Sequence, residues 1–144
     1  MTTLAIIGGG PAGYVAAITA AQQGQQVILI EQGPLGGTCL NEGCMPTKSL
    51  LESAEVYEKV RHAEDFGISL SSAQVGVNWN QVQQRKNRIV QTLVQGIGYL
   101  MKKNRIQVKN GTASFLTANR LRVENESGQE IVEADRFIIA SGSE

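Results

Sequence analysis

Two cysteines and a lysine lie close together in the segment Gly36–Lys48, which reads GGTCLNEGCMPTK. Cys39 and Cys44 are the only cysteines among the 144 residues. Such a pair suits inert buried thiols, half of a metal site, or a redox-active disulfide. A zinc site usually takes four ligands, and the single histidine, His62, follows Cys44 by 18 residues on a segment that we expect to be an exposed helix. The pattern therefore favours the redox-active disulfide.

A disulfide between these two cysteines places a condition on the backbone. On an ideal helix, residues i and i+5 are about 7.5 Å apart along the axis and point about 140° apart. A disulfide needs Cα atoms within about 7 Å of each other. Gly43 lies between the cysteines and Pro46 follows them. We therefore predict that a bridge here lies on a distorted helical turn.

Lys48 is the first basic residue of the chain and follows Cys44 by four positions. On a helix this spacing brings two side chains to one face, one turn apart. A nearby ammonium favours a thiolate over a thiol, and so does a helix start, which we expect near Gly37 and Thr38 beside Cys39. A solvent-exposed lysine without a role is the simpler alternative.

The first thirty residues are typical of a strand, a helix and a second strand. Leu4–Gly8 is a short apolar run, and Ala12–Gln23 is rich in alanine and ends before Gly24, a typical C-terminal cap. Gln26–Ile30 is again apolar and of strand length. Continuously apolar strands are typical of parallel sheets that are covered on both faces. We predict a βαβ unit.

Gly8, Gly10 and Gly13 form the pattern G-x-G-x-x-G at the turn between the first strand and the helix. In this context the first glycine permits the tight turn, the second lets the backbone approach a pyrophosphate, and the third lets helix and strand pack closely. Glu31 ends the second strand, where it should accept hydrogen bonds from the hydroxyls of an adenosine ribose. A 2′-phosphate would meet a like charge there, which disfavours NADP. These residues alone do not distinguish FAD from NAD, and a tight turn without a ligand is the simpler alternative.

The middle of the chain predicts helices. Helical sequence continues through the cysteines to about Ala63, a connector spans Phe66–Asn78, and Asn80–Lys103 reads as a long amphipathic helix. Gly96 and Gly98 inside that helix should each cost about 1 kcal/mol relative to alanine, which suggests close packing against a neighbour or a kink. The apolar stripe of this helix consists of Val82, Ile89, Leu93, Ile97 and Leu100.

Beyond Asn104 the sequence predicts short strands. Four runs are separated by Asn, Gly and Ser: IQVKNG, TASFLT, RLRVEN and EIVEADRFIIA, the last ending in the apolar Arg136–Ala140. Together with the βαβ unit, they predict an α/β fold of Rossmann-like type. We expect a parallel sheet and a small antiparallel β-meander near the C-terminus.

The overall composition excludes several classes of protein. The formal net charge is zero and 42% of the residues are hydrophobic, unlike a nucleic-acid binder or an acidic disordered chain. Residues 1–30 carry no charge, but a signal peptide needs a basic start and a continuous apolar core, and glycines and a proline interrupt this segment. No apolar run reaches the roughly 18 residues of a membrane span. We expect a cytoplasmic protein, in which a disulfide is more often catalytic than structural.

Three segments carry a family resemblance: GGGPAGYVAA, GGTCLNEGCMPTKSLL and IIASGSE. The chain resembles the FAD-containing pyridine nucleotide–disulfide oxidoreductases over its whole length, and within them the dihydrolipoamide dehydrogenase branch most closely. Glutathione- and mercuric-reductase-like members are the alternative branches. The joint occurrence of the glycine motif and C-L-N-E-G-C is far more specific than either motif alone.

The resemblance implies FAD in this domain and roles for individual residues. It implies that Cys44 is the thiol beside the flavin, that Cys39 exchanges with the substrate disulfide, and that Lys48 lies near the flavin N5. It implies electron transfer from dihydrolipoamide, or another small dithiol, through the disulfide and the flavin to NAD as co-substrate. The cofactor-binding residues that it implies are Gly8, Gly10, Pro11, Ala12, Gly13, Glu31, Gln32, Gly37, Thr38, Cys39, Lys48, Ala113, Ser141, Gly142 and Ser143.

The chain also departs from the family pattern. Glu42 replaces a small or apolar residue, Met45 a β-branched one, and Ser141 a threonine; we expect the Glu42 side chain to point outward. Family chains are much longer, so residues 1–144 are expected to be the N-terminal segment of the FAD-binding domain. The NAD-binding, returning FAD and interface domains would then be absent and turnover incomplete. A non-catalytic FAD- or nucleotide-binding module is the alternative. Full-length members are homodimers and can belong to 2-oxoacid dehydrogenase complexes.

Overall fold

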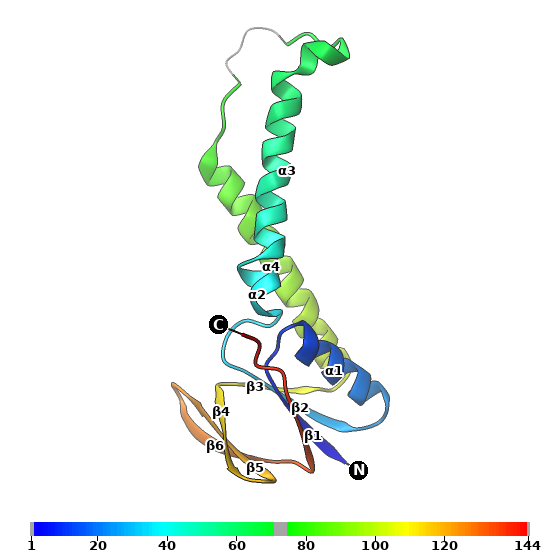
Figure 1. Cartoon of the computed structure of the whole chain (residues 1–144), viewed down its shortest axis with the longest axis vertical. Helices are drawn as coiled ribbons and strands as arrows, with labels where there is room; N and C mark the ends of the chain where they lie inside the picture. The colour runs from blue at the N-terminus through cyan, green and yellow to red at the C-terminus, as the bar shows by residue number, and fades with distance from the viewer. Residues whose placement is uncertain (1, 71–74, 144) are drawn as a thin grey trace.

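The computed structural model describes residues 2–70 and 75–143 and confirms the α/β fold (Figure 1). A four-stranded sheet and a three-stranded sheet form the body, from which two long helices project. In chain order the elements are β1 (Thr3–Ile7), α1 (Pro11–Gln22), β2 (Gln26–Glu31), α2 (Gly37–Asn41), α3 (Cys44–Arg61), the 3-10 helix η1 (Ala63–Phe66), α4 (Trp79–Lys103), β3 (Gln107–Asn110), β4 (Thr112–Thr117), β5 (Arg120–Asn125), β6 (Gly128–Glu133) and β7 (Arg136–Ile139).

The larger sheet has the strand order β3-β2-β1-β7, and all its neighbouring strands are parallel. Ile6 in β1 is opposite Leu29 in β2 on one side and Ile138 in β7 on the other. The predicted βαβ unit is therefore confirmed, with element ends within one residue of the predicted ones. The carboxyl ends of β1, β2 and β7 consequently lie at one edge of the sheet.

Alternate residues of β1 face opposite sides of this sheet, because side chains in a strand alternate with period two. Leu4 and Ile6 pack with α1 and α4, whereas Ala5 packs with the smaller sheet. Both faces are thus covered, as the apolar strands predicted. The buried residues on the helical side are Leu4, Ile6, Ala17, Ala20, Val27, Leu29, Ile97, Met101 and Ile106. Those on the other side are Ala5, Ile30, Leu121, Val123, Val132 and Ala134.

The smaller sheet is the predicted antiparallel meander, with the order β4-β5-β6. The first of the four predicted runs lies elsewhere, because β3 pairs in parallel with β2, with Val108 opposite Leu29. The last run divides into β6 and β7 at Ala134 and Asp135. Asp135 and Thr3 exchange two hydrogen bonds there, of 2.7 and 3.0 Å, which hold the start of β7 beside β1.

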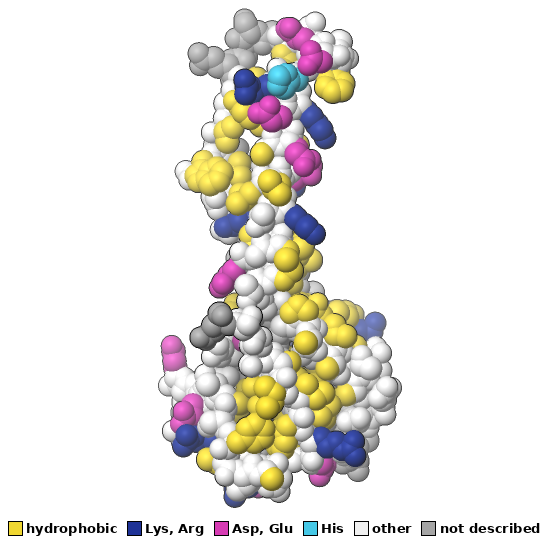
Figure 2. Space-filling model, in the orientation of Figure 1, with side chains coloured by type: hydrophobic (Ala, Val, Ile, Leu, Met, Phe, Trp, Pro, Cys, Tyr) yellow, Lys and Arg dark blue, Asp and Glu magenta, His cyan; other side chains and the backbone are white. Residues whose placement is uncertain are grey.

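Helices α3 and α4 lie side by side and form a long arm (Figure 1). Arg85 in α4 donates from Nη1 to the carbonyl oxygen and to Oγ of the buried Ser49 in α3, at 3.1 Å each. Hydrophobic side chains run along the arm surface (Figure 2), and Val56 and Trp79 are 49% and 59% exposed. The predicted connector Phe66–Asn78 joins the two helices, but residues 71–74 lie outside the described part of the chain.

Two expectations for the long helix are wrong. The apolar stripe does not end at Leu100, which is 38% exposed; Met101 is buried instead, four residues after the buried Ile97 as the helical repeat requires. Gly96 and Gly98 do not pack closely against another element, since apart from adjacent residues and the helix's own backbone no atom of the described chain lies within 4 Å of a Cβ built on either. The helix also continues through both glycines to Lys103.

Candidate cofactor and redox site

A cavity of about 610 Å³ lies at the carboxyl edge of the parallel sheet. Nucleotide ligands of open α/β sheets bind at this edge, and the volume is within the usual range of small-molecule sites. The chain segments that follow β1, β2 and β7 all contribute to its wall. The lining residues are Gly8, Gly10, Pro11, Ala12, Glu31, Gln32, Gly33, Pro34, Gly37, Thr38, Cys39, Asn41, Glu42, Ala140, Ser141, Gly142 and Ser143.

Glycines let three backbone segments approach one another at this cavity. Gly8 has φ of +105°, and a Cβ built on it would lie 2.6 Å from the carbonyl carbon of Ala140. Gly37 has φ of +65°, and a Cβ there would lie 2.8 Å from Cα of Gly10. A Cβ on Gly13 would overlap the carbonyl oxygen of Gly8. The structure thus confirms the tight turn at Gly8 and the close helix–strand contact at Gly13.

The N-terminus of α1 opens onto this cavity. Gly10 is the N-cap, Pro11 and Ala12 begin the helix, and no side chain caps its first turn. The first hydrogen bond of the helix runs from the Tyr14 N–H to the Gly10 carbonyl oxygen, at 2.9 Å. The N–H groups of Ala12 and Gly13 therefore precede the helical hydrogen-bond ladder, and the first turn holds no acidic residue. Helix starts with free N–H groups attract phosphate, through those groups and the positive end of the helix dipole.

Glu31 is held in place by two backbone groups at the end of β2. Its Oε2 accepts a hydrogen bond from the Gly9 N–H at 2.6 Å, and its Oε1 accepts one from the Gly33 N–H at 2.8 Å. An ionised carboxylate offers about four acceptor positions, so two remain for the hydroxyls of a ligand. The neighbouring Gln32 contacts Thr112 of β4 through a side-chain hydrogen bond of 3.3 Å.

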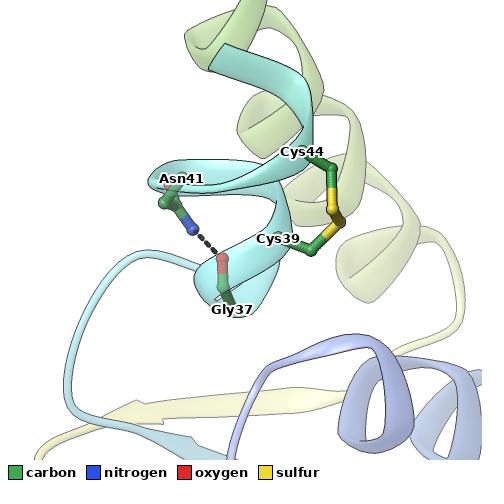
Figure 3. Close-up of a disulfide and its surroundings, with 4 residues drawn as sticks. All are labelled: Gly37, Cys39, Asn41 and Cys44. Carbon is green, nitrogen blue, oxygen red and sulfur yellow. Dashed lines mark hydrogen bonds between the residues drawn. A yellow bond between two sulfur atoms is a disulfide. The ribbon is translucent and has the colours of Figure 1, made fainter. Parts of the chain in front are cut away.

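Cys39 and Cys44 form a disulfide with a Cα–Cα distance of 4.8 Å (Figure 3). Cys39 lies in α2 and Cys44 is the first residue of α3, so the helix is interrupted between them. Gly43 has φ of −109° and ψ of −104°, far from helical values. Its N–H and that of Glu42 both donate to the Thr38 carbonyl oxygen, at 2.7 and 2.9 Å. The predicted distortion around Gly43 is confirmed.

Asn41 fixes the loop that leads into the disulfide, on the other side of the ribbon from the two sulfurs (Figure 3). Its Nδ2 donates to the carbonyl oxygens of Gly37, Leu35 and Pro34, at 3.0, 3.2 and 3.5 Å. These contacts tie the last residue of α2 to the Gly- and Pro-rich loop before it. Sequence reasoning missed Asn41, although an asparagine beside a glycine-containing turn is a known signal for side chain–backbone hydrogen bonding.

The cavity brings together most, but not all, of the residues predicted to bind the cofactor. Lys48 is exposed on α3 and does not belong to the wall. Cys44 is also outside the wall, whereas Cys39 is part of it. Gly13 is buried behind the turn, and the Ala113 side chain packs on the core of the smaller sheet. The wall members that the sequence analysis did not predict as cofactor-binding are Gly33, Pro34, Asn41, Glu42 and Ala140.

His62 is the C-cap residue of α3, at the opposite end of that helix from the disulfide. Its side chain is 59% exposed and stands 3.5 Å from a Glu58 carboxylate oxygen and 3.6 Å from one of Asp65. Within residues 2–70 and 75–143, no three His, Cys, Asp or Glu side chains gather in a way that could hold a metal ion. None of the helices described is both long and apolar enough to cross a membrane.

Comparison with known proteins places these features in context. Residues 2–144 match the family described as "Pyridine nucleotide-disulphide oxidoreductase". A dihydrolipoyl dehydrogenase of Bacillus subtilis is 63% identical over 99% of this chain and 31% of its own length. The mitochondrial dihydrolipoyl dehydrogenase of Schizosaccharomyces pombe is 46% identical over 98% of this chain and 28% of its own.

A solved structure shows the same fold. The HOCl-induced flavoprotein disulfide reductase RclA of Escherichia coli, a Cu(II) complex, superposes with a TM-score of 0.80 and 30% identity. The match covers 98% of this chain and 28% of that protein. The chain thus spans about a third or less of the length of these relatives.

Proposed function

This chain belongs to the pyridine nucleotide–disulphide oxidoreductase family, and from that premise we propose that it binds FAD and passes electrons between a dithiol substrate and the flavin through the Cys39–Cys44 disulfide. One observation carries the proposal. The glycine-rich turn and Cys39 line the same cavity at the carboxyl edge of the sheet. This shared wall brings the candidate phosphate-binding turn and the first cysteine of the disulfide to one ligand site.

The residues of the cavity fit FAD. The start of α1 offers free N–H groups and no competing carboxylate for the diphosphate. Gly10 and Gly37 leave backbone, without side-chain bulk, facing the same space. Glu31 keeps acceptor positions for the ribose hydroxyls, and its charge disfavours a 2′-phosphate. When bound, FAD would supply hydride-transfer chemistry with a nicotinamide, which no amino-acid side chain provides.

The remaining cofactor residues are proposed by resemblance. Ser141, Gly142 and Ser143 follow β7 and line the cavity, which supports a contact with the cofactor. The Ala113 side chain points into the core, so only its backbone is available to an adenine. Lys48 lies outside the wall, and its place near the flavin N5 is proposed from the family resemblance alone.

The disulfide can oxidise a dithiol without any other group of the chain changing its oxidation state. A substrate thiolate attacks Cys39 Sγ, the S–S bond breaks, and Cys44 leaves as a thiolate. The second substrate thiolate then attacks the sulfur bound to Cys39, which releases Cys39 as a thiolate and closes the substrate disulfide. Two substrate thiols are oxidised and the protein disulfide gains two electrons. Cys44 begins an 18-residue helix, whose positive end stabilises its thiolate.

Relatives support a more specific proposal for the whole protein. We infer that the dithiol is dihydrolipoamide and that NAD is the final electron acceptor, because the similar proteins from Bacillus subtilis and Schizosaccharomyces pombe are dihydrolipoyl dehydrogenases. From the family resemblance we propose further that the full-length protein is a homodimer that can belong to a 2-oxoacid dehydrogenase complex, and from the sequence that it acts in the cytoplasm.

Binding and exchange experiments test this proposal. FAD is titrated into wild type, Glu31→Ala and Cys39→Ser, and binding is followed by flavin fluorescence. The wild type and Cys39→Ser should bind alike, and Glu31→Ala should bind more weakly. Dihydrolipoamide should then yield two alkylatable thiols in the wild type. FAD binding without disulfide reduction would instead identify a nucleotide-binding module with an idle disulfide.

A further inference from the structure

The arm formed by α3 and α4 has no buried core beyond its base. Within the described structure, none of the residues 50–61 of α3 or 79–96 of α4 is buried. Helices in proteins gain most of their stability from packing an apolar face. The apolar side chains of α4 in this stretch stay half-buried although α3 lies beside them; they are Val82, Ile89, Val90, Leu93 and Val94. One neighbouring helix therefore leaves the apolar face of α4 incompletely covered.

Large apolar side chains are also exposed on the surface of the arm (Figure 2). Leu51, Trp79 and Tyr99 are 56%, 59% and 64% exposed. The chain exposes 9839 Å² in all, whereas a compact monomer of 15.5 kDa exposes about 7,200 Å². The excess of about 2,600 Å² matches the area that one subunit contributes to a large, permanent interface, which is about 1,000–2,500 Å².

The two helices of the arm carry different charges. Helix α4 has five basic residues and no acidic one, whereas the middle of α3 carries the carboxylates of Glu52, Glu55 and Glu58. Among the described residues, no ion pair joins α3 to α4, and the cations of α4 take part in none. A surface complementary to this arm would thus place carboxylates against α4 and cations against α3, which is what a second arm offers.

We propose that the arm is an interaction surface for a second copy of this chain. The two arms pack as a four-helix bundle, in which α4 of each copy lies against α3 of the other. A two-fold axis repeats every contact, so both apolar faces are covered and both sets of carboxylates meet cations. The inference rests on the proposed function only in naming a surface for the homodimer; it requires neither FAD nor the disulfide.

The apolar part of this surface is tested by sedimentation velocity of the 144-residue chain over a series of concentrations. Val56→Asn places a neutral polar group on α3 without changing any charge. Val15→Asn is the matched control, since Val15 is also a helical valine and the two are 49% and 52% exposed. We expect the wild type to dimerise, Val56→Asn to raise the dissociation constant of the dimer about tenfold or more, and Val15→Asn to leave it unchanged.

A charge exchange tests whether the partner is a second arm. The double variant Glu52→Lys, Glu55→Lys makes α3 basic, and the double variant Lys86→Glu, Arg88→Glu adds carboxylates to α4. Each variant alone sets like charges against each other in both contacts, so it should dimerise more weakly than wild type, by about tenfold at low salt. In an equal mixture of the two, opposite charges meet in both contacts, and a mixed dimer should form. Far-UV circular dichroism checks that each variant is folded.

Three results would overturn the proposal. One is a wild-type chain that stays monomeric at about 0.1 mM, far above the dissociation constants of stable interfaces; the arm would then be a surface for another part of a longer protein. The others are a dimer that Val56→Asn weakens no more than Val15→Asn, and a mixture that associates no better than its two components. None of these measurements involves FAD or a thiol, so the binding and exchange experiments above test the proposed electron transfer independently.

Discussion

Gly13 provides a quantitative test of how the sequence forms the phosphate-binding turn. It is buried at the start of α1, where it touches the turn at Gly8. A Cβ added at this position would overlap the Gly8 carbonyl oxygen and lie 2.9 Å from its carbon. Both atoms belong to the backbone of the turn, so no side-chain rotation relieves the clash. Gly13→Ala therefore forces α1 away from β1.

The expected cost follows from the size of that displacement. Non-bonded heavy atoms pack best at about 3.5–4.0 Å, so the helix must move by roughly 1 Å or more. This movement loosens the contacts of Ala17 and Ala20 with Leu4 and Ile6 in the core. Overpacking typically lowers the free energy of unfolding by about 1–3 kcal/mol. A clash with backbone atoms should cost at least the upper value of this range, because the backbone cannot rotate away. We expect a loss of about 3 kcal/mol or more in the free energy of unfolding.

Gly96→Ala is the matched control. It is the same substitution in a helix interior, but beyond the adjacent residues and the backbone of α4 itself, no atom of the described chain lies within 4 Å of the added methyl group. Alanine should therefore stabilise α4 by about 1 kcal/mol through helix propensity alone. The two variants differ in the sign of their effect although their chemistry is identical.

Urea unfolding followed by far-UV circular dichroism measures both changes. Fluorescence is less suitable, because the single tryptophan, Trp79, lies 59% exposed at the start of α4 and reports on the arm. Gly13→Ala should unfold at a lower urea concentration than wild type and Gly96→Ala at a higher one. If Gly13→Ala were as stable as wild type, the close contact of α1 with the turn would not be a requirement of the fold.

Three further changes test individual contacts. Glu31→Gln replaces acceptors of the Gly9 and Gly33 N–H groups with an amide that satisfies only one of them, so the dissociation constant for FAD should rise about tenfold; equal affinity in a fluorescence titration would refute the role of Glu31. Asn41→Ala removes three hydrogen bonds to loop carbonyls and should lower the free energy of unfolding by about 1–2 kcal/mol; an unchanged urea midpoint would argue against it. Arg85→Met keeps an unbranched side chain but loses both hydrogen bonds to Ser49. It should lower the free energy of opening of α3 by about 1 kcal/mol and so speed its amide hydrogen exchange; exchange as slow as in wild type would show that the arm does not depend on these two hydrogen bonds.

Local sequence patterns were sufficient to predict the βαβ unit at the start of the chain. The apolar runs Leu4–Gly8 and Gln26–Ile30 are consecutive and short, so their pairing requires only the usual right-handed crossover through the helix. The glycine spacing then defines the turn between them. The break at Gly43 was also predictable, because a bridge over five residues is incompatible with a regular helix.

Long-range pairing and surface geometry were not predictable in the same way. β3 joins β2 across some 80 residues, since Val108 pairs with Leu29, and nothing in its local sequence distinguishes it from the meander strands. Gly96 and Gly98 suggested a close helix contact because glycine has no side chain, but whether a neighbouring element lies there depends on the tertiary structure. Asn41 bonds to three carbonyls only because the preceding loop curls around it.

The assignment of the two thiols is the central claim; it is drawn from the family resemblance, while the cavity wall includes Cys39 but not Cys44. The most direct measurement is the visible spectrum of the FAD-loaded chain during anaerobic two-electron reduction. The account predicts a long-wavelength absorption band from a thiolate beside the oxidised flavin. The band should appear in wild type once two electrons have reduced the disulfide, should already be present in Cys39→Ser before any reduction, and should be absent from Cys44→Ser. A band that survives in Cys44→Ser and disappears in Cys39→Ser would contradict the account, because the thiol beside the flavin would then be Cys39.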